Sequence, residues 1–161
     1  MHREAAKTIA IAILLHGVFT IGLPWWLLRA THDVTWAWLP LGPLRWLGPP
    51  LIAFGIYLYI WSVARLLARQ TSALPGQAPT ALETDGWYAR VRHPLLLGVV
   101  AILIGEAIAA RSLALSAYAL LYWLWLHAFV TRREEPDLRA AFGPAYDDYC
   151  RRVPRWLPNR R

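Results

Sequence analysis

The stretch GWYARVRHPLLLG, residues 86–98, marks the point where a polar segment passes into a long apolar run. Its first half delivers Arg92 and His93, and its apolar half begins at Pro94. Proline is tolerated at the first position of a helix because the N–H group that it lacks would have no partner there. The stretch therefore predicts that Arg92 and His93 lie where a soluble segment meets an apolar helix.

The composition is typical of an integral membrane protein rather than of a soluble domain. The chain has 161 residues, of which 57% are hydrophobic and ten are tryptophans, and its mean hydropathy is +0.33. A helix needs about 20 apolar residues to cross a bilayer. Four runs of about that length occur, at about residues 8–28, 49–67, 94–110 and 112–130. We expect an all-α, polytopic membrane protein with a single domain over residues 1–161.

The basic residues are distributed unevenly among the segments that separate these runs. Of the 17 Lys and Arg residues, 14 lie before the first run, from the end of the second run to the third, or after the fourth. Cytoplasmic segments of membrane proteins are enriched in such residues. We therefore expect a multi-pass protein with both termini in the cytoplasm, in the inner membrane if the source is a prokaryote. The net charge of +7 indicates topology and contact with the lipid bilayer, not nucleic-acid binding.

Several common classes of functional site are excluded by their missing motifs. Cys150 is the only cysteine, so neither an internal disulfide nor a multi-cysteine metal site is possible. The sequence contains no phosphate-binding Walker loop, no HExxH zinc motif, no nucleophile elbow and no dinucleotide-binding GxGxxG. We predict no metal.

The turn between the third and fourth runs predicts which charged residues meet. Only Arg111 and its neighbours are available for this connection, so the two helices are expected to form a tight antiparallel hairpin. At about 1.5 Å per residue, residues 93 and 132 both lie roughly 27–32 Å from the turn. The hairpin should therefore bring Arg92 and His93 close to the segment Arg132–Glu135. The alternative is that these charged residues simply face lipid at the membrane surface.

The segment 131–158 is expected to form a short helical cytoplasmic tail. Pro136 suits a helix start, Gly143 a helix end, and Pro144 the start of a second short helix. Before the third run, Thr84 and Asp85 are plausible side-chain caps for a short helical piece.

The paired motifs GWYARVRHPLLLG and EEPDLRAAFGPAYDDYCRRVPRWLP resemble the isoprenylcysteine carboxyl methyltransferase family and its bacterial and archaeal relatives, with phospholipid N-methyltransferases as more distant kin. The resemblance covers about residues 84–158, with the motifs in order and separated by the hairpin. It implies a membrane enzyme that binds S-adenosylmethionine between the hairpin and the cytoplasmic segments 84–93 and 131–158.

The resemblance also assigns roles to individual residues. It implies cofactor binding by Tyr88, Arg92, His93, Pro94, Gly98, Glu134, Glu135 and Tyr146. It implies catalytic roles for Arg132, which would orient an anionic or thiol substrate, and for Glu135. Relatives usually carry a tyrosine two residues after the proline, where this chain has Leu96. The methyl acceptor is therefore predicted only by class, as a lipophilic or small thiol or carboxyl compound, and the oligomeric state stays open.

Two other functions compete with this interpretation. A membrane reductase of the sterol-reductase type, which uses NADPH, shares the Tyr-Cys-x-x-Val-Pro ending seen at residues 149–154. The short chain and the lack of an extra basic cluster for a 2′-phosphate weigh against it. A non-enzymatic membrane scaffold would leave the convergence of His93 with Glu134 and Glu135 without a role. His127 is open between supporting the site and helix packing.

Overall fold

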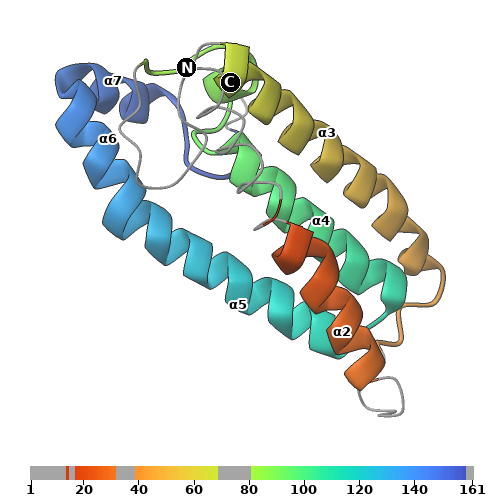
Figure 1. The fold of residues 1–161 in the computed structure, drawn as a ribbon. Coiled ribbons are helices and arrows are strands. Elements are labelled where there is room, and N and C mark those ends of the chain that lie inside the picture. Colours follow the sequence, from red (N-terminus) through yellow and green to blue (C-terminus); the bar gives the residue numbers. More distant parts are fainter. Residues whose placement is uncertain (1–13, 15–16, 32–38, 69–80, 159–161) are drawn as a thin grey trace.

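The computed structural model describes residues 14, 17–31, 39–68 and 81–158, and its regular elements are helices (Figure 1). This confirms the all-α prediction. A π-helical turn η1 (Val18–Gly22) precedes α2 (Leu23–Ala30), and the 3₁₀ turn η3 (Gly42–Leu47) leads into α3 (Gly48–Ala68). A second 3₁₀ turn, η4 (Gly86–Ala89), precedes α4 (Pro94–Ala110). The remaining elements are α5 (Leu113–Phe129), η5 (Val130–Glu134), α6 (Glu135–Phe142) and α7 (Pro144–Arg152).

Helices α3 and α4 lie against each other with their backbones in close contact, because glycines face glycines. A Cβ atom added to Gly55 would lie 2.6 Å from the carbonyl oxygen of Gly98, and one added to Gly98 would lie 2.7 Å from that of Gly55. Small residues permit such approach and favour association of apolar helices. Gly98 is therefore committed to helix packing.

Helices α4 and α5 form the predicted antiparallel hairpin (Figure 1). Arg111 ends α4 with a left-handed backbone of φ 55°. Ser112 then begins α5, and its hydroxyl accepts a hydrogen bond of 3.2 Å from the N–H of Leu115. Satisfying a free N–H at a helix start in this way stabilises the helix. The turn is thus as short as the sequence indicated.

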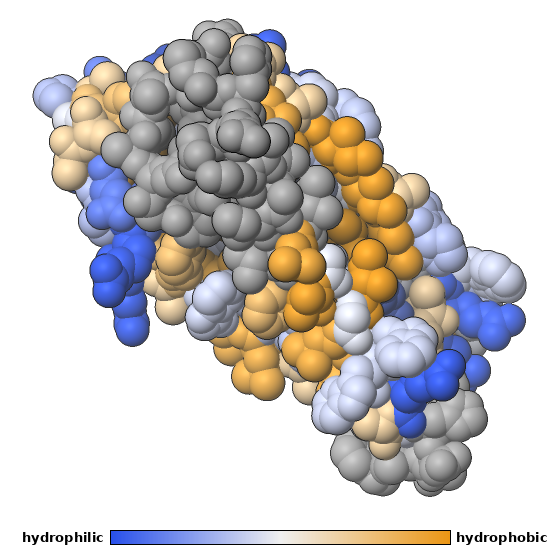
Figure 2. Space-filling view, in the orientation of Figure 1, coloured by the Kyte–Doolittle hydropathy of each residue, from blue (hydrophilic) through white to orange (hydrophobic). Residues whose placement is uncertain are grey.

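Two helical stretches, Gly42–Ala68 and Leu113–Phe142, are long and apolar enough to cross a membrane. The apolar stretches Val18–Ala30 and Pro94–Ala110 are shorter. Large apolar side chains are exposed along α5, including Leu121 at 65% and Trp125 at 58%. Figure 2 shows apolar side chains gathered over the middle of the molecule. This surface supports membrane association. The expected four-span topology stays a prediction, and much of the first expected span lies outside the described residues.

The fourth run ends in α5 at Phe129, within one residue of the expected end, and Pro136 lies in the first turn of α6 as expected. The sequence did not predict that the π-helical turn η5 joins α5 and α6 into one continuous helix. The N–H of Glu135 bonds to the carbonyl of Val130, five residues earlier. Such a π turn widens the helix. It accommodates Pro136, which has no backbone N–H to donate to a helical hydrogen bond. Gly143, with φ 52°, ends α6, and Pro144 begins α7 as predicted.

Of the two expected caps, Asp85 does occupy the N-cap position of η4, but its side chain makes no capping bond. Its carboxylate instead lies 3.4 Å from the guanidinium of Arg65, at the end of α3. The ring of Tyr88 is buried and lies 6.1 Å from that of Trp61. Tertiary contacts with α3, rather than a local cap, fix this segment ahead of α4.

Candidate active site

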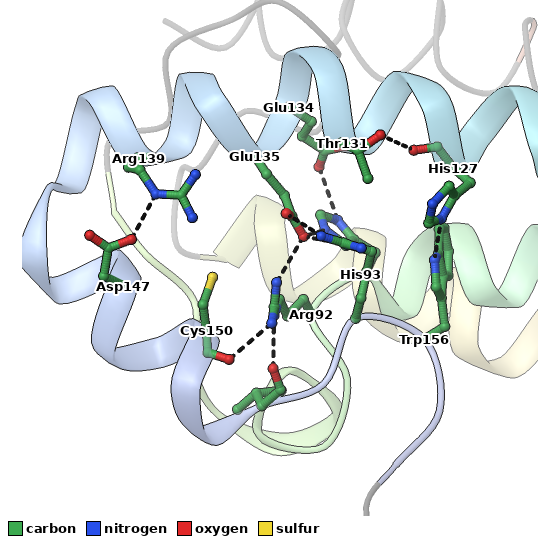
Figure 3. A network of polar contacts seen from close by, with 12 residues as sticks. Arg92, His93, His127, Thr131, Glu134, Glu135, Arg139, Asp147, Cys150 and Trp156 are labelled. Carbon is green, nitrogen blue, oxygen red and sulfur yellow. Dashed lines mark hydrogen bonds and ion pairs between the residues drawn. The ribbon is translucent and has the colours of Figure 1, made fainter.

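Arg92 lies between η4 and α4 and anchors the C-terminal tail to the start of α4 (Figure 3). Its backbone N–H donates to the carbonyl of Pro154 over 2.9 Å. Its guanidinium donates through Nε to the carbonyl of Val153 over 2.8 Å and through Nη2 to that of Cys150 over 2.9 Å. The third guanidinium nitrogen donates to Glu135. Each of the three guanidinium nitrogens of Arg92 therefore donates at least one hydrogen bond within the protein.

Glu135, at the start of α6, is buried and held by two arginines. Its Oε1 accepts from Arg92 Nη1 over 3.0 Å and from Arg155 Nε over 2.8 Å, and its Oε2 accepts from Arg155 Nη2 over 2.7 Å. Burial alone would raise the pKa of this carboxyl group. The hydrogen bonds from Arg155, the nearby imidazole of His93 and the guanidinium charges outweigh burial and hold the pKa well below its usual range. The carboxylate of Glu135 is therefore ionised at neutral pH and is held in place by Arg92 and Arg155.

His93 is the last residue before α4, is only 5% exposed, and faces both members of the acidic pair. Its Nδ1 lies 3.3 Å from Glu134 Oε1, and its Nε2 lies 3.6 Å from Glu135 Oε1. Burial lowers the pKa of the imidazole, but the adjacent carboxylates of Glu134 and Glu135 raise it above the ordinary value. The site therefore favours a charged imidazolium.

Glu134 differs from its neighbour in exposure and in partners. Its side chain is 35% exposed, whereas that of Glu135 is 6% exposed. Within the part of the chain that the structure describes, its ion pair is with His93. Glu134 therefore presents carboxylate oxygens to solvent beside a buried histidine.

Trp156 of the tail lies between two histidines. Its indole Nε1–H donates to Nδ1 of His127 over 3.1 Å. The ring centroid of Trp156 lies 6.0 Å from that of His93 and 6.2 Å from that of His127. His127, on α5, thus holds the tail in place, and Trp156 places an aromatic wall beside His93.

The tyrosines of the predicted site form the core that fastens α7. Tyr146, Tyr149 and Val153 are buried together, and the hydroxyl of Tyr149 donates to the carbonyl of Tyr88 over 2.7 Å. The buried hydroxyl of Tyr146 makes no hydrogen bond to any described residue. Burial raises the pKa of Tyr146, with a smaller effect from the charge of Glu135, so this phenol stays protonated at neutral pH and can donate.

The structure brings together only some of the residues that the sequence predicted. Arg92, His93, Glu134 and Glu135 converge, and Pro94 starts α4. Tyr146 lies in the tail core, whereas the ring of Tyr88 lies beside Trp61 of α3. Arg132 does not join them, because it lies on the exposed side of η5 and has no ion pair within the described ranges. Gly98 does not join them either, because α3 covers it.

Arg155 was missed by sequence reasoning. It follows the Val-Pro dipeptide in a tail whose many arginines look alike in sequence. A buried carboxylate needs a cation, which could have prompted a search for a partner. Only the fold identifies Arg155 as that cation.

Comparison with known proteins identifies the family. The model of the phospholipid methyltransferase family matches residues 44–145, which is more than half of the chain. The chain belongs to this family. The match confirms the resemblance drawn from residues 84–158 and extends it back over α3.

Three curated relatives show how varied this family's proteins are. The chain is 26% identical over 157 residues to the nickel-cobalt-cadmium resistance protein NccN of Alcaligenes xylosoxydans xylosoxydans, covering 98% of the chain and 65% of the relative. It is 30% identical over 114 residues to the cobalt-zinc-cadmium resistance protein CzcN of Cupriavidus metallidurans, covering 70% and 51%. It is 36% identical over 129 residues to methanethiol S-methyltransferase 2 of Bradyrhizobium diazoefficiens, covering 76% and 46%.

The chain thus spans between about half and two thirds of the length of these relatives. No solved structure matches it. Despite the names of two relatives, no group of three or more His, Cys, Asp or Glu side chains among the described residues could hold a metal ion.

Proposed function

We propose that the chain is an integral membrane methyltransferase that uses S-adenosylmethionine to methylate a lipophilic or small thiol or carboxyl acceptor. Membership of the phospholipid methyltransferase family and the 36% identity to a methanethiol S-methyltransferase support this function. The observation that carries the proposal is the convergence of His93 with Glu134 and Glu135 at the start of an apolar helix. Such a cluster of buried, perturbed titratable groups is a candidate functional site.

The groups that remain available at the site fit this cofactor. S-adenosylmethionine carries an ammonium group and ribose hydroxyls, which need acceptors, and a carboxylate, which needs donors. The half-exposed Glu134 can accept. The buried Nε2 of His93 and the hydroxyl of Tyr146, which make no hydrogen bond to described residues, can donate. Arg92 and Glu135, which we also expect to contact the cofactor, hold the tail and each other through hydrogen bonds.

When bound, the cofactor supplies a methyl group on a sulfonium, which an acceptor displaces in line. Such a transfer depends on alignment more than on a strong base. The protein's part is therefore to orient both reactants and to exclude water. His93 and Glu134 fix the polar end of the cofactor, and the Trp156 ring beside His93 supplies an apolar, electron-rich surface suited to a cation.

The charge distribution supports a multi-pass topology with the site at the cytoplasmic surface. Nearly all basic residues lie in alternate segments, including the tail that completes the site. A reporter fused after residue 161 should therefore be active if it requires the cytoplasm and inactive if it requires export. The opposite result would overturn this topology.

Calorimetric titration of the detergent-purified chain with S-adenosylhomocysteine, and separately with NADPH, tests the proposed activity. We expect binding of S-adenosylhomocysteine alone, and its loss in His93→Ala. Arg151→Ala is a matched control, because Arg151 is 72% exposed and pairs with Asp148 on the outer face of α7. Binding of NADPH alone would assign the chain to the reductases. Binding of neither ligand in detergent or in lipid nanodiscs would favour a scaffold.

A further inference from the structure

Arg155 lies in the irregular segment after α7 and grips Glu135 with two nitrogens. Its Nε and Nη2 donate to the two carboxylate oxygens over 2.8 and 2.7 Å. The arginine side chain is 31% exposed, whereas the carboxylate that it holds is 6% exposed. Two parallel hydrogen bonds to a buried carboxylate are a geometry that arginine can form and lysine cannot.

Because Arg155 contacts only Glu135 of the acidic pair, the carboxylates of Glu134 and Glu135 have different surroundings. Glu135 receives three guanidinium hydrogen bonds and lies 3.6 Å from His93 Nε2, beyond hydrogen-bonding distance. Glu134 receives none from the arginines that the structure describes, lies closer to the imidazole at 3.3 Å, and is 35% exposed. Of the two, only Glu134 has room to meet a ligand.

We propose that Arg155 is a positioning residue of the candidate active site. Arg155 occupies the carboxylate oxygens of Glu135 with hydrogen bonds. Glu134 is then the carboxylate that orients His93 and accepts hydrogen bonds from the ammonium or hydroxyl groups of the cofactor. Without Arg155, Oε2 of Glu135 loses its partner, and the carboxylate turns toward Nε2 of His93. The imidazole is then drawn away from Glu134. The cofactor part of this inference rests on the proposed function, and the arginine part rests on geometry.

The charged groups around His93 set the sign of the expected electrostatic change. The carboxylates facing His93 are Glu134 of η5 and Glu135 of α6, and the arginines beside them are Arg92 of the segment before α4 and Arg155 of the tail. His127 of α5 lies beyond the Trp156 ring. Removing Arg155 removes a cation and frees an anion beside the imidazole. Both changes favour imidazolium, so the pKa of His93 should rise, by about 1 unit.

The first test is an NMR titration of the full chain in detergent micelles without any ligand. The histidine Cε1 signals are followed from pH 5 to pH 9, and His93→Gln identifies the signal of His93. Arg155→Ala should raise the titration midpoint of His93 by about 1 unit, Arg155→Lys by less, and the control Arg151→Ala not at all. A role in folding alone would lower the thermal midpoint and leave the His93 titration unchanged, which would overturn the proposal.

The second test is the affinity for S-adenosylhomocysteine of the same variants. Arg155→Ala should weaken binding by about tenfold and Arg155→Lys by about threefold, because lysine restores the charge without the paired hydrogen bonds. Arg151→Ala should bind like the wild type. If Arg155→Ala does not fold, Arg155→Lys decides, and wild-type affinity together with a wild-type His93 midpoint would overturn the proposal. If the wild type itself binds no S-adenosylhomocysteine, the proposed function fails, while the ligand-free titration still decides the role of Arg155.

Discussion

Trp156 donates its indole N–H to Nδ1 of His127 over 3.1 Å, across 29 residues of sequence. An indole nitrogen can only donate, so Nδ1 of His127 must be unprotonated in this arrangement and the ring proton lies on Nε2. The same indole lies against His93 at the start of α4. One tryptophan thus joins the tail, α5 and the candidate site.

Replacing Trp156 with phenylalanine should loosen the tail without removing its apolar contact. The acceptor on His127 would be left without its donor, which costs about 1 kcal/mol. Thermal unfolding in detergent measures the loss, with Trp125→Phe as a control because Trp125 is 58% exposed on α5. In a His127→Phe background the Trp156→Phe change should cost much less. Equal costs in both backgrounds would contradict the link.

Glu134 and Glu135 should respond differently to the same substitution. Glu135→Gln removes the charge that pairs two arginines in a buried site, so it should lower the free energy of unfolding by about 3 kcal/mol. Glu134→Gln should change stability by less than about 1 kcal/mol but weaken binding of S-adenosylhomocysteine. Denaturant unfolding and calorimetry separate the two effects. A large loss of stability in Glu134→Gln would reverse the assignment of the two carboxylates.

The site also predicts how stability depends on pH. The pKa of His93 in the fold is above 6.5, so its stabilising contribution is complete below about pH 6.5 and is lost as pH rises through the folded pKa. The pKa of Glu135 in the fold is below 4.5, so its contribution is complete above about pH 4.5 and is lost as pH falls through the folded pKa. The thermal midpoint should therefore be highest between about pH 4.5 and 6.5.

His93→Gln provides the control for this pH dependence. The variant cannot form an imidazolium, so its thermal midpoint should lack the decline that the wild type shows above about pH 6.5. Thermal unfolding is measured at half-unit intervals from pH 4 to pH 9 in one detergent. Parallel curves for the two proteins would show that His93 does not titrate within the fold as its two carboxylate neighbours require.

The packing of α3 on α4 should tolerate no side chain at Gly55. An alanine Cβ there would lie 2.6 Å from the carbonyl oxygen of Gly98, which is backbone and cannot move alone. Gly55→Ala should therefore destabilise the fold by about 1–3 kcal/mol. Gly17→Ala is the matched control, because its Cβ would have no neighbour within 4 Å. Similar thermal midpoints for both variants would mean that the two helices are not in backbone contact.

The sequence alone determined the helices and the convergence at the hairpin. Apolar runs of fixed length predicted α3 within one residue at each end and α4 at both ends, because hydrophobic length and proline position are local properties. The short connection at Arg111 then forced residues equally distant from the turn to meet. Arg92, His93, Glu134 and Glu135 could be named for that reason.

Only the tertiary structure decided how those residues divide their roles. Sequence spacing cannot tell which of many tail arginines reaches a buried carboxylate, because that choice depends on how α7 and the segment after it fold back. Arg155 was therefore missed, and Arg132, two residues before the acidic pair but on the exposed side of η5, was preferred. The sequence allowed Gly98 to pack against a helix or to contact the cofactor, and only the fold shows that α3 covers it. Local patterns fix elements and their ends, whereas charge pairing and close packing depend on surfaces that exist only after the helices assemble.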